Sequence, residues 1–364
     1  MKFRKLISKI KRALSEFLCF FFLLCLIQHL VAAAGIEFPQ NSRGKGSLVF
    51  NLENDVWLHR DDGYTNGIGF SWVSPELKEK SKSAWLRFLY RLNILFLGDE
   101  LEEKTNKGSG AEEKRWATIS LAQGMFTPAD LSKKEIIPYD RPYAGLLYAG
   151  LNLVKNGESN QDSFGAALGT IGPASLAEAA QKWLHRTYGW VDPQGWENQL
   201  KNEPVFELWL SRFWTLTGRS STDACSSWRP AVKVGLGGEV GNLMTDVEAV
   251  LDLKFGLNLQ PQNEAFSPSP LFNQLIMASF SRTSIYVFCR LEGKGVLRNL
   301  LLDGNTFALS PKVKPDYFYG QITSGLVYCS SQASLSFYAV IRTKEFKGQR
   351  YFDPYCGLSL GFNF

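Results

Sequence analysis

A dense polar segment at residues 53–66 lies between two apolar stretches of alternating pattern. It contains Asn54, Asp55 and Thr65, whose side chains offer an amide, a carboxylate and a hydroxyl. A carboxylate can hold a divalent cation, and a cation beside an ester stabilises the negative charge that develops on the carbonyl oxygen during hydrolysis. The segment is therefore either a solvated hairpin loop or one wall of an active site.

His185 is one of only two histidines after residue 34, the other being His59. It lies in "GPASLAEAAQKWLHRTYGW", where Pro173 favours a first helical turn and Gly189 a C-terminal cap. A histidine in a helix over the mouth of a folded domain can act as a general base for ester hydrolysis. The alternative is a surface histidine at a helix C terminus, where the macrodipole favours it.

Lys133 and Lys134 are adjacent cations in a third polar segment. A lysine can stabilise a developing oxyanion, or it can bind the phosphates of a lipid. Two exposed loop lysines with neither role are the simpler interpretation that the residues leave open.

Residues 1–34 have the pattern of a secretory signal peptide, with a basic start, an apolar run over 17–27 and the small residues Ala32, Ala33 and Ala34. The apolar run has 11 residues, which is shorter than the ~20 that a spanning helix requires. An uncleaved anchor is the alternative. We expect residues 1–34 to be removed and residues 35–364 to form the mature domain.

The leader carries most of the excess positive charge, because 34 basic and 34 acidic side chains remain without it. A near-neutral chain of this kind gives no indication of nucleic-acid binding. The four remaining cysteines are too widely spaced for a metal site or a CxxC motif, and the sequence does not say whether they pair. They are Cys225, Cys289, Cys329 and Cys356.

The mature chain consists of short segments with period-two alternation, separated by turn residues, and the C-terminal segment "YCGLSLGFNF" shows the pattern best. Alternation, export, an even number of segments and 13% aromatic residues predict an all-β fold, namely a closed antiparallel transmembrane β-barrel of about 12 strands in the outer membrane of a Gram-negative bacterium. A soluble periplasmic β-sandwich is the alternative. The predicted strands are 46–53, 65–74, 114–125, 141–154, 162–171, 203–216, 228–239, 246–258, 283–294, 315–328, 333–343 and 352–364.

Strand parity assigns the connections to the two ends of such a barrel. With both termini in the periplasm, the connections 54–64, 124–140 and 172–202 are external, so the three polar segments share one rim. The connection 75–113 is periplasmic and contains "SAWLRFLYRLNILF", which predicts a short amphipathic helix against that edge of the barrel.

Several ordered motifs resemble the lipid A 3′-O-deacylase (LpxR) family from about residue 46 to the C terminus. They are "NLENDVW", "DDGYTNGIGFSW", "GMFTPADL", "YDRPYAGLLYAGL", the His185 helix with "QGWENQL", "LLDGNTF" and "RTKEFKGQ". The resemblance implies a twelve-stranded outer-membrane barrel that removes the 3′-linked acyloxyacyl group of lipid A with the help of calcium. We expect lipid A or lipopolysaccharide as substrate, contact with outer-membrane lipid, and a monomer.

The resemblance also implies roles for residues at matching positions. His185 corresponds to the general base that activates a water molecule. The catalytic residues Asn54, Asp55, Thr65 and Lys133 correspond to the remainder of the site, and Lys133 and Lys134 would contact the substrate.

One position departs from the family pattern. A glutamate associated with calcium is expected six residues after the histidine, and Val191 stands there instead. Asp192 is a possible substitute, so the predicted metal ligands are Asp55 and Asp192, with Asp61 and Asp62 as the next candidates.

Two other functions are compatible with an outer-membrane barrel. An esterase similar to outer-membrane phospholipase A would place a serine beside the histidine, but Arg186 and Thr187 follow His185. A non-enzymatic pore or adhesin is the second alternative, although twelve strands leave little lumen once loops fold inward.

Overall fold

The computed structural model describes most of the chain after residue 45. The expected signal peptide, His59, Asp61 and Cys225 lie outside the described residues. The described ranges are 46–58, 62–99, 113–157, 159–217, 228–259, 264–268, 273–277 and 283–364.

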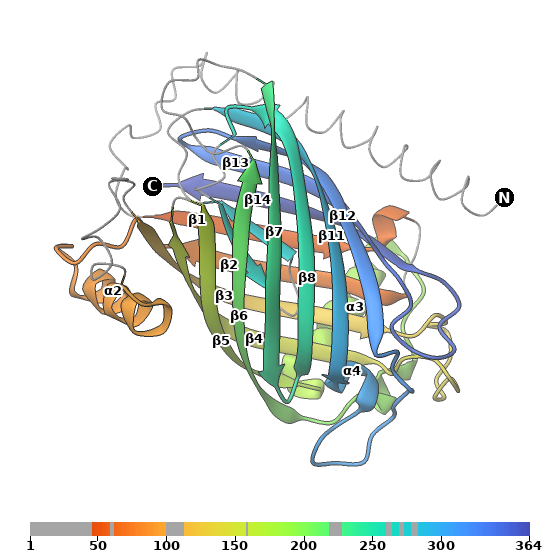
Figure 1. Cartoon of the computed structure of the whole chain (residues 1–364). Coiled ribbons are helices and arrows are strands. Elements are labelled where there is room, and N and C mark those ends of the chain that lie inside the picture. The colour runs from red at the N-terminus through yellow and green to blue at the C-terminus, as the bar shows by residue number, and fades with distance from the viewer. Residues whose placement is uncertain are drawn as a thin grey trace.

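Twelve strands close into one antiparallel barrel (Figure 1), which confirms the predicted fold class. Each predicted strand overlaps one barrel strand. The barrel closes where the last strand pairs with the first, from Ser47 opposite Asn363 to Asn54 opposite Cys356. The barrel strands are β1 (Ser47–Asn54), β2 (Gly63–Val73), β3 (Lys114–Thr127), β4 (Ala144–Asn156), β5 (Asn160–Ile171), β6 (Glu203–Thr217), β7 (Trp228–Gly241), β8 (Met244–Leu257), β11 (Ser284–Asn299), β12 (Phe318–Cys329), β13 (Ala333–Arg342) and β14 (Asp353–Asn363).

Two features of the sheets differ from the prediction. The connection between β8 and β11 contains a separate two-stranded sheet of β9 (Glu264–Pro268) and β10 (Asn273–Met277). β11 runs five residues beyond its predicted end at 294, because its ladder with β8 continues past an irregularity between Val296 and Arg298. Gly293 and Gly295, near this end, have no side chains to show the period-two pattern, but both remain paired in the backbone ladder.

Side chains alternate between the lumen and the outer wall, as in a barrel surrounded by lipid. Along β6, for example, Phe206 and Leu210 are exposed on the outside, whereas Trp209 and Ser211 are buried. Inside the lumen, the carboxylate of Glu53 accepts hydrogen bonds from the hydroxyls of two tyrosines that face it. Paired polar side chains therefore occupy this part of the lumen.

The connections follow the predicted parity. Those after β1, β3, β5, β7, β11 and β13 lie at one end of the barrel, which we call the loop end. Both ends of the barrel chain, Ser47 and Asn363, lie at the opposite end, which we call the terminus end. Asn54, Lys133 and His185 thus belong to the same end, although 131 residues separate the first from the last.

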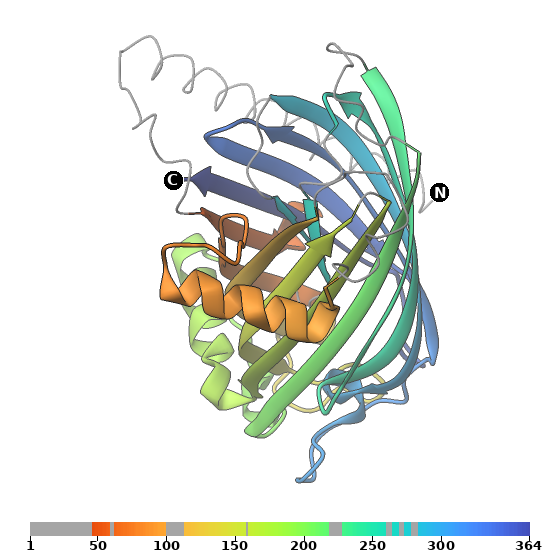
Figure 2. The same ribbon diagram turned by 60° about the vertical axis from the view of Figure 1, so that its left-hand side comes forward.

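Two helices lie against the outside of the barrel. α2 (Ala84–Leu97) crosses the outer face of β3–β5 near the terminus end, as Figure 2 shows. α3 (Ala177–Tyr188) lies at the loop end, where Ala177 packs against Met125. Met125 has the same parity along β3 as the exposed Leu121, so α3 covers the outer wall. The expectation of a helix over the barrel mouth was therefore wrong.

The limits of α3 follow from backbone geometry. Pro173 begins a separate 3-10 turn, η3 (Pro173–Ser175), and not α3 as predicted, because Leu176 has a left-handed φ of 62° that interrupts the helix. Gly189 ends α3 as predicted, with φ 68° and its N–H donating to the carbonyl of His185. Of the described helices, none is long and apolar enough to cross a membrane.

The orientation of the barrel in the membrane can be tested with epitope tags. A tag beside the exposed Phe307, in the connection after β11, should be detected on intact cells. A tag beside Lys80, in the connection after β2, should be detected only after the outer membrane is permeabilised. Detection of the Lys80 tag on intact cells would mean that the terminus end faces outward.

Candidate active site

The end of the β1–β2 hairpin delivers Asn54, Thr65 and Asn66 to the outer wall. Asn54 pairs with Asn66 across the two strands, and Asn66 pairs with Met125, the residue that α3 covers. Thr65 occupies a register irregularity between β2 and β3, and bulges of this kind redirect a side chain. Its hydroxyl is 2.6 Å from that of Thr127 on β3. Three polar side chains therefore stand on the wall beside the helix.

Asp55 shapes the turn that follows β1. Its side chain is fully buried, and its Oδ2 accepts a hydrogen bond from the backbone N–H of Asp62 at 2.7 Å. Its own N–H donates to the carbonyl of Thr65 at 3.3 Å. A buried carboxylate requires such partners because its desolvation is costly. The carboxylate of Asp55 is therefore held inside the turn after β1, and its backbone is tied to that of Thr65.

His185 lies on the buried face of α3 together with Ala177 and Gln181. The imidazole Nδ1 is 2.5 Å from the carbonyl oxygen of Val191, and the ring meets Trp190 edge-on at 5.6 Å between centroids. A carbonyl can only accept a hydrogen bond, so Nδ1 carries a proton, and in the neutral ring the lone pair is therefore on Nε2. This is the tautomer that a general base requires.

Val191 thus has a role that does not depend on its side chain. The side chain is 61% exposed, whereas the carbonyl oxygen orients the imidazole. A backbone carbonyl is supplied by any residue type at this position. The absence of the expected glutamate therefore leaves the orientation of His185 intact.

A cleft of about 1200 Å³ opens at the loop end and unites segments that are far apart in sequence. Asp62, Lys133 and Val191 line it, so it joins the turn after β1, the connection after β3 and the end of the α3 segment. His185 does not line the cleft itself but is hydrogen-bonded to the backbone of Val191, which does. The remaining walls come from residues 137–141 and from the connection between β13 and β14.

Lys134 and Asp192 are turned toward other partners. The Lys134 ammonium lies 3.4 Å from the carboxylate of Glu197, and both side chains are largely exposed. Asp192 is exposed, and its carboxylate accepts from the side chain of Gln194 at 3.0 Å. The structure therefore brings Lys133 into the cleft, while Lys134 and Asp192 lie on the surface near it.

The donor atoms around the cleft suit a hard cation but do not complete its shell. Asp62, Asp130, Asp140 and Asp353 all line the cleft. Hydrogen bonds from the hydroxyl and the backbone N–H of Ser132, together with Lys133, lower the pKa of Asp130, so it stays ionised. In the part of the chain that the structure describes, no three His, Cys, Asp or Glu side chains converge as a metal site. Calcium would therefore need backbone and substrate oxygens in addition.

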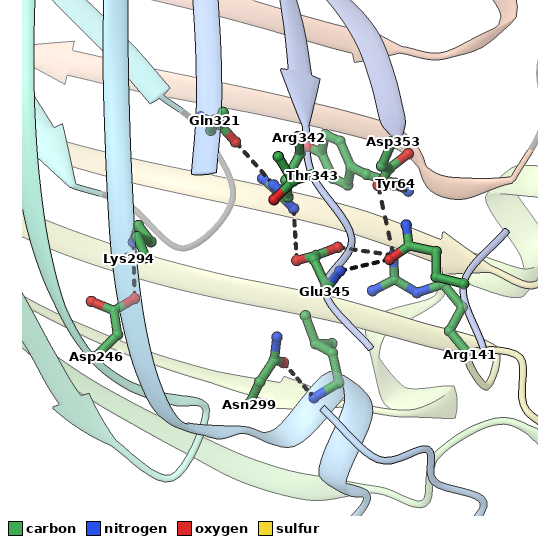
Figure 3. Close-up of polar contacts among 12 residues, drawn as sticks. Tyr64, Arg141, Asp246, Lys294, Asn299, Gln321, Arg342, Thr343, Glu345 and Asp353 are labelled. Atoms are coloured by element: carbon green, nitrogen blue, oxygen red, sulfur yellow. Dashed lines mark hydrogen bonds and ion pairs between the residues drawn. The ribbon is translucent and has the colours of Figure 1, made fainter. Parts of the chain in front are cut away.

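A buried arginine, Arg141, connects the cleft with the lumen. Its Nη1 lies 3.8 Å from Glu345 and 3.9 Å from Asp353, and its guanidinium stacks over Phe126 at 4.8 Å. Glu345 in turn binds Arg342 at 3.1 Å (Figure 3). Arg141 and Glu345 belong to the motifs "YDRPYAG" and "RTKEFKGQ", whose role the sequence did not reveal. They join the connection after β3 to the connection after β13.

Gln181 is a second residue that the sequence analysis missed. It lies one helical turn before His185, and its Oε1 accepts from the indole of Trp196 at 2.7 Å. Its Nε2 is buried and has no hydrogen-bond partner among the residues that the structure describes. The i, i+4 spacing from His185 was the only available signal, and a glutamine in a helix is too common for that spacing to be noticed.

A family model described as "Outer membrane protein LpxR" matches residues 18–364. The chain belongs to the LpxR family. It is accordingly a protein of the Gram-negative outer membrane.

One solved structure supports the fold of this LpxR-family chain. It matches "LpxR from Salmonella typhimurium" with a TM-score of 0.67 and 18% identity, covering 87% of this chain and 100% of that chain. The translocator domain of the autotransporter NalP from Neisseria meningitidis matches with a TM-score of 0.39 and 9% identity, covering 97% and 99% of the respective chains. No curated protein sequence matches the chain. The first match shows the same barrel fold.

Replacing Arg141 by methionine should destabilise this LpxR-family barrel by about 3–5 kcal/mol, because Glu345 and Asp353 would lose a buried cation. Urea denaturation of the protein refolded in vesicles would measure the loss. Lys134→Met is the matched control, since the exposed pair with Glu197 contributes about 1 kcal/mol or less. Equal stability of the two variants would mean that the Arg141 network does not hold the loops together.

Proposed function

We propose that this LpxR-family chain is a lipid A deacylase, a carboxylic ester hydrolase that cleaves the 3′-linked acyloxyacyl ester in a calcium-dependent reaction. The observation that carries the proposal is the position of His185. On the buried face of α3, which lies on the outer wall of an outer-membrane barrel, a buried imidazole has its Nδ1 held by a backbone carbonyl. A lipid substrate reaches such a site without leaving the membrane.

Nε2 of His185 takes a proton from a water molecule, whose oxygen attacks the carbonyl carbon of the 3′ ester. The bond from this carbon to the 3′ oxygen then breaks, and the imidazolium returns its proton to that oxygen. The products are the free acyloxyacyl acid and lipid A with a 3′ hydroxyl. The Val191 carbonyl keeps the ring in one tautomer and also stabilises the imidazolium.

Negative charge on the attacked carbonyl oxygen needs donors or cations nearby. Lys133 lines the cleft and can supply its ammonium, and the buried Nε2 of Gln181 is a donor one turn from His185. Calcium, when held by Asp55 with Asp192 as second ligand, would supply positive charge beside the same oxygen. Asn54 and Thr65 would support this wall, and Lys134, on the surface near the cleft, would contact phosphates of the substrate.

The alternative functions receive less support. Thr187, the nearest hydroxyl in sequence after His185, is exposed and donates to the carbonyl of Trp183 at 2.8 Å, so it is not placed as the nucleophile of a phospholipase A-like esterase. A pore would need an open lumen. Polar pairs such as Lys294 with Asp246, at 2.9 Å, occupy the lumen instead (Figure 3).

Replacing His185 by glutamine should reduce deacylation by about two to four orders of magnitude, the usual effect of losing a general base. Mass spectrometry of lipid A from a host that expresses each variant would measure loss of the 3′ acyloxyacyl group. Val191→Ala is the matched control and should retain activity, because it keeps the carbonyl that orients the ring. Wild-type turnover by His185→Gln would remove this residue from the mechanism.

Replacing Asp55 by asparagine should raise the calcium concentration for half-maximal activity by about tenfold, because an anionic oxygen is lost while the acceptor for the Asp62 N–H remains. Asp192→Asn tests the second ligand separately, and Val191→Glu should lower the calcium requirement. Titration of calcium into chelator-treated enzyme gives all three values. Full activity of the wild-type protein in excess chelator would contradict the calcium dependence.

A further inference from the structure

α2 has a defined position on the lipid-facing wall near the terminus end. It covers Ala117 on β3 and Leu153 on β4, and its Phe96 stacks on Phe164 of β5 at 4.2 Å between ring centroids. Ala117 has the same parity along β3 as Ile119, which is exposed on the outside. The helix therefore displaces lipid from the outer wall of three strands (Figure 2).

A buried polar anchor fixes the orientation of α2. The Asn93 side chain is fully buried and donates to the carbonyl oxygens of Trp116 and Val154, at 3.3 Å and 3.0 Å. Its Oδ1 accepts from Arg115 at 2.8 Å, and Arg115 also donates to the carbonyl of Gly98 just past the helix end. Hydrogen bonds at Asn93 and at the C-terminal end of the helix prevent its rotation about its own axis on the wall. The surface that it turns away from the barrel is therefore constant.

The side chains of α2 divide into three stripes, given about 100° of rotation per residue. Leu89 and Asn93 face the barrel. Arg87 and Arg91 form a second, cationic stripe. The third stripe holds large apolar side chains that no described part of the protein covers, with Leu95 72% exposed. Its members are Trp85, Phe88 and Leu95, whereas Phe96 at its edge packs against Phe164 of the barrel.

We propose that α2 is a membrane-surface helix that docks into the phospholipid leaflet at the terminus end. The apolar stripe continues the lipid-facing surface of β3–β5, so the leaflet that surrounds the strands also meets this stripe. Tryptophan at such a level is typical of a bilayer interface. Residues 76–91 hold five Lys and Arg against two Glu, a balance that complements anionic phospholipid headgroups.

The distance between α2 and α3 along β3 is comparable to the height of the apolar band of a membrane barrel. Both helices cover the outer face of β3, α3 at Met125 and α2 at Ala117. Eight residues of strand span about 27 Å, which is about 20 Å along the membrane normal for a strand tilted by about 40°. The apolar band of a barrel is about 25 Å tall. Each helix therefore lies at one boundary of this band, on the wall that carries the candidate active site.

Fluorescence quenching of Trp85 tests the docking. The full mature chain and its Trp85→Phe variant are refolded in vesicles of phosphatidylcholine and phosphatidylglycerol, and their difference spectrum isolates Trp85. Lipids brominated on the acyl chains should quench this emission several-fold more than aqueous iodide. Should Trp85→Phe refold poorly, a Phe88→Trp substitution in the wild-type background, compared with the wild-type protein, reports the same stripe.

Leu95→Glu places a charge in the apolar stripe and should lower quenching of Trp85 by brominated lipid by at least half. Arg91→Gln, on the cationic stripe, is the matched control and should change it little. Quenching by iodide alone would mean that the stripe faces water, which overturns the proposal. Trp85 could instead be protected from both quenchers, with protection that increases with the ratio of protein to lipid. That result would mean that a second copy of the chain covers the stripe, and it would also overturn the proposal.

Discussion

The pairing of β1 with β14 is the interaction on which the remainder of the structure depends. Hydrocarbon offers no partners for backbone N–H and C=O groups, so a sheet in the membrane must close on itself. Eight residue pairs make this closure, from Ser47–Asn363 to Asn54–Cys356. The final pair of the closing ladder contains Asn54, the first polar residue of the candidate active site. The strand that seals the barrel thus also positions one wall of the site.

The two faces of the β1–β2 hairpin end serve different purposes. Glu53 points into the lumen and binds Tyr64 and Tyr338, whereas Asn54 points to the outer wall. A shift of one residue in register would exchange them, placing the carboxylate toward lipid and the amide in the lumen. The irregularity at Thr65 lets Tyr64 stay inside while Thr65 meets Thr127 on β3. The contacts of Glu53 in the lumen and the contact of Thr65 on the outer wall therefore require the same strand register.

The position of α3 explains how the site tolerates valine at position 191. The helix lies close to the wall because Gly145 has no side chain; a Cβ there would meet Ser175 Oγ at a clashing separation. His185 is then held between the wall and the segment after the helix, where a backbone carbonyl orients its ring. The imidazole depends on the path of the chain at Val191 and not on the residue type. Metal ligation is the property for which a side chain at this position would matter.

The sequence by itself determined the features that arise from local patterns. Period-two alternation located all twelve barrel strands, because neighbouring side chains must face lipid and lumen in turn. Helix signals found the segments of α2 and α3, and they placed the candidate base His185 near the end of the second. Strand parity then placed Asn54, Lys133 and His185 at one end. Each of these inferences needs only the chain direction and the nearest few residues.

Tertiary structure decided the contacts between segments that no local pattern relates. Arg141, Glu345 and Asp353 meet across more than 200 residues, so their network could not be read from spacing. The placement of α3 on the outer wall instead of over the mouth depended on Gly145 and Met125, which only the register of β3 and β4 brings together. The role of the Val191 carbonyl could not be predicted for a different reason. Every residue has a backbone carbonyl, and only the fold decides which of them accepts the hydrogen bond from His185.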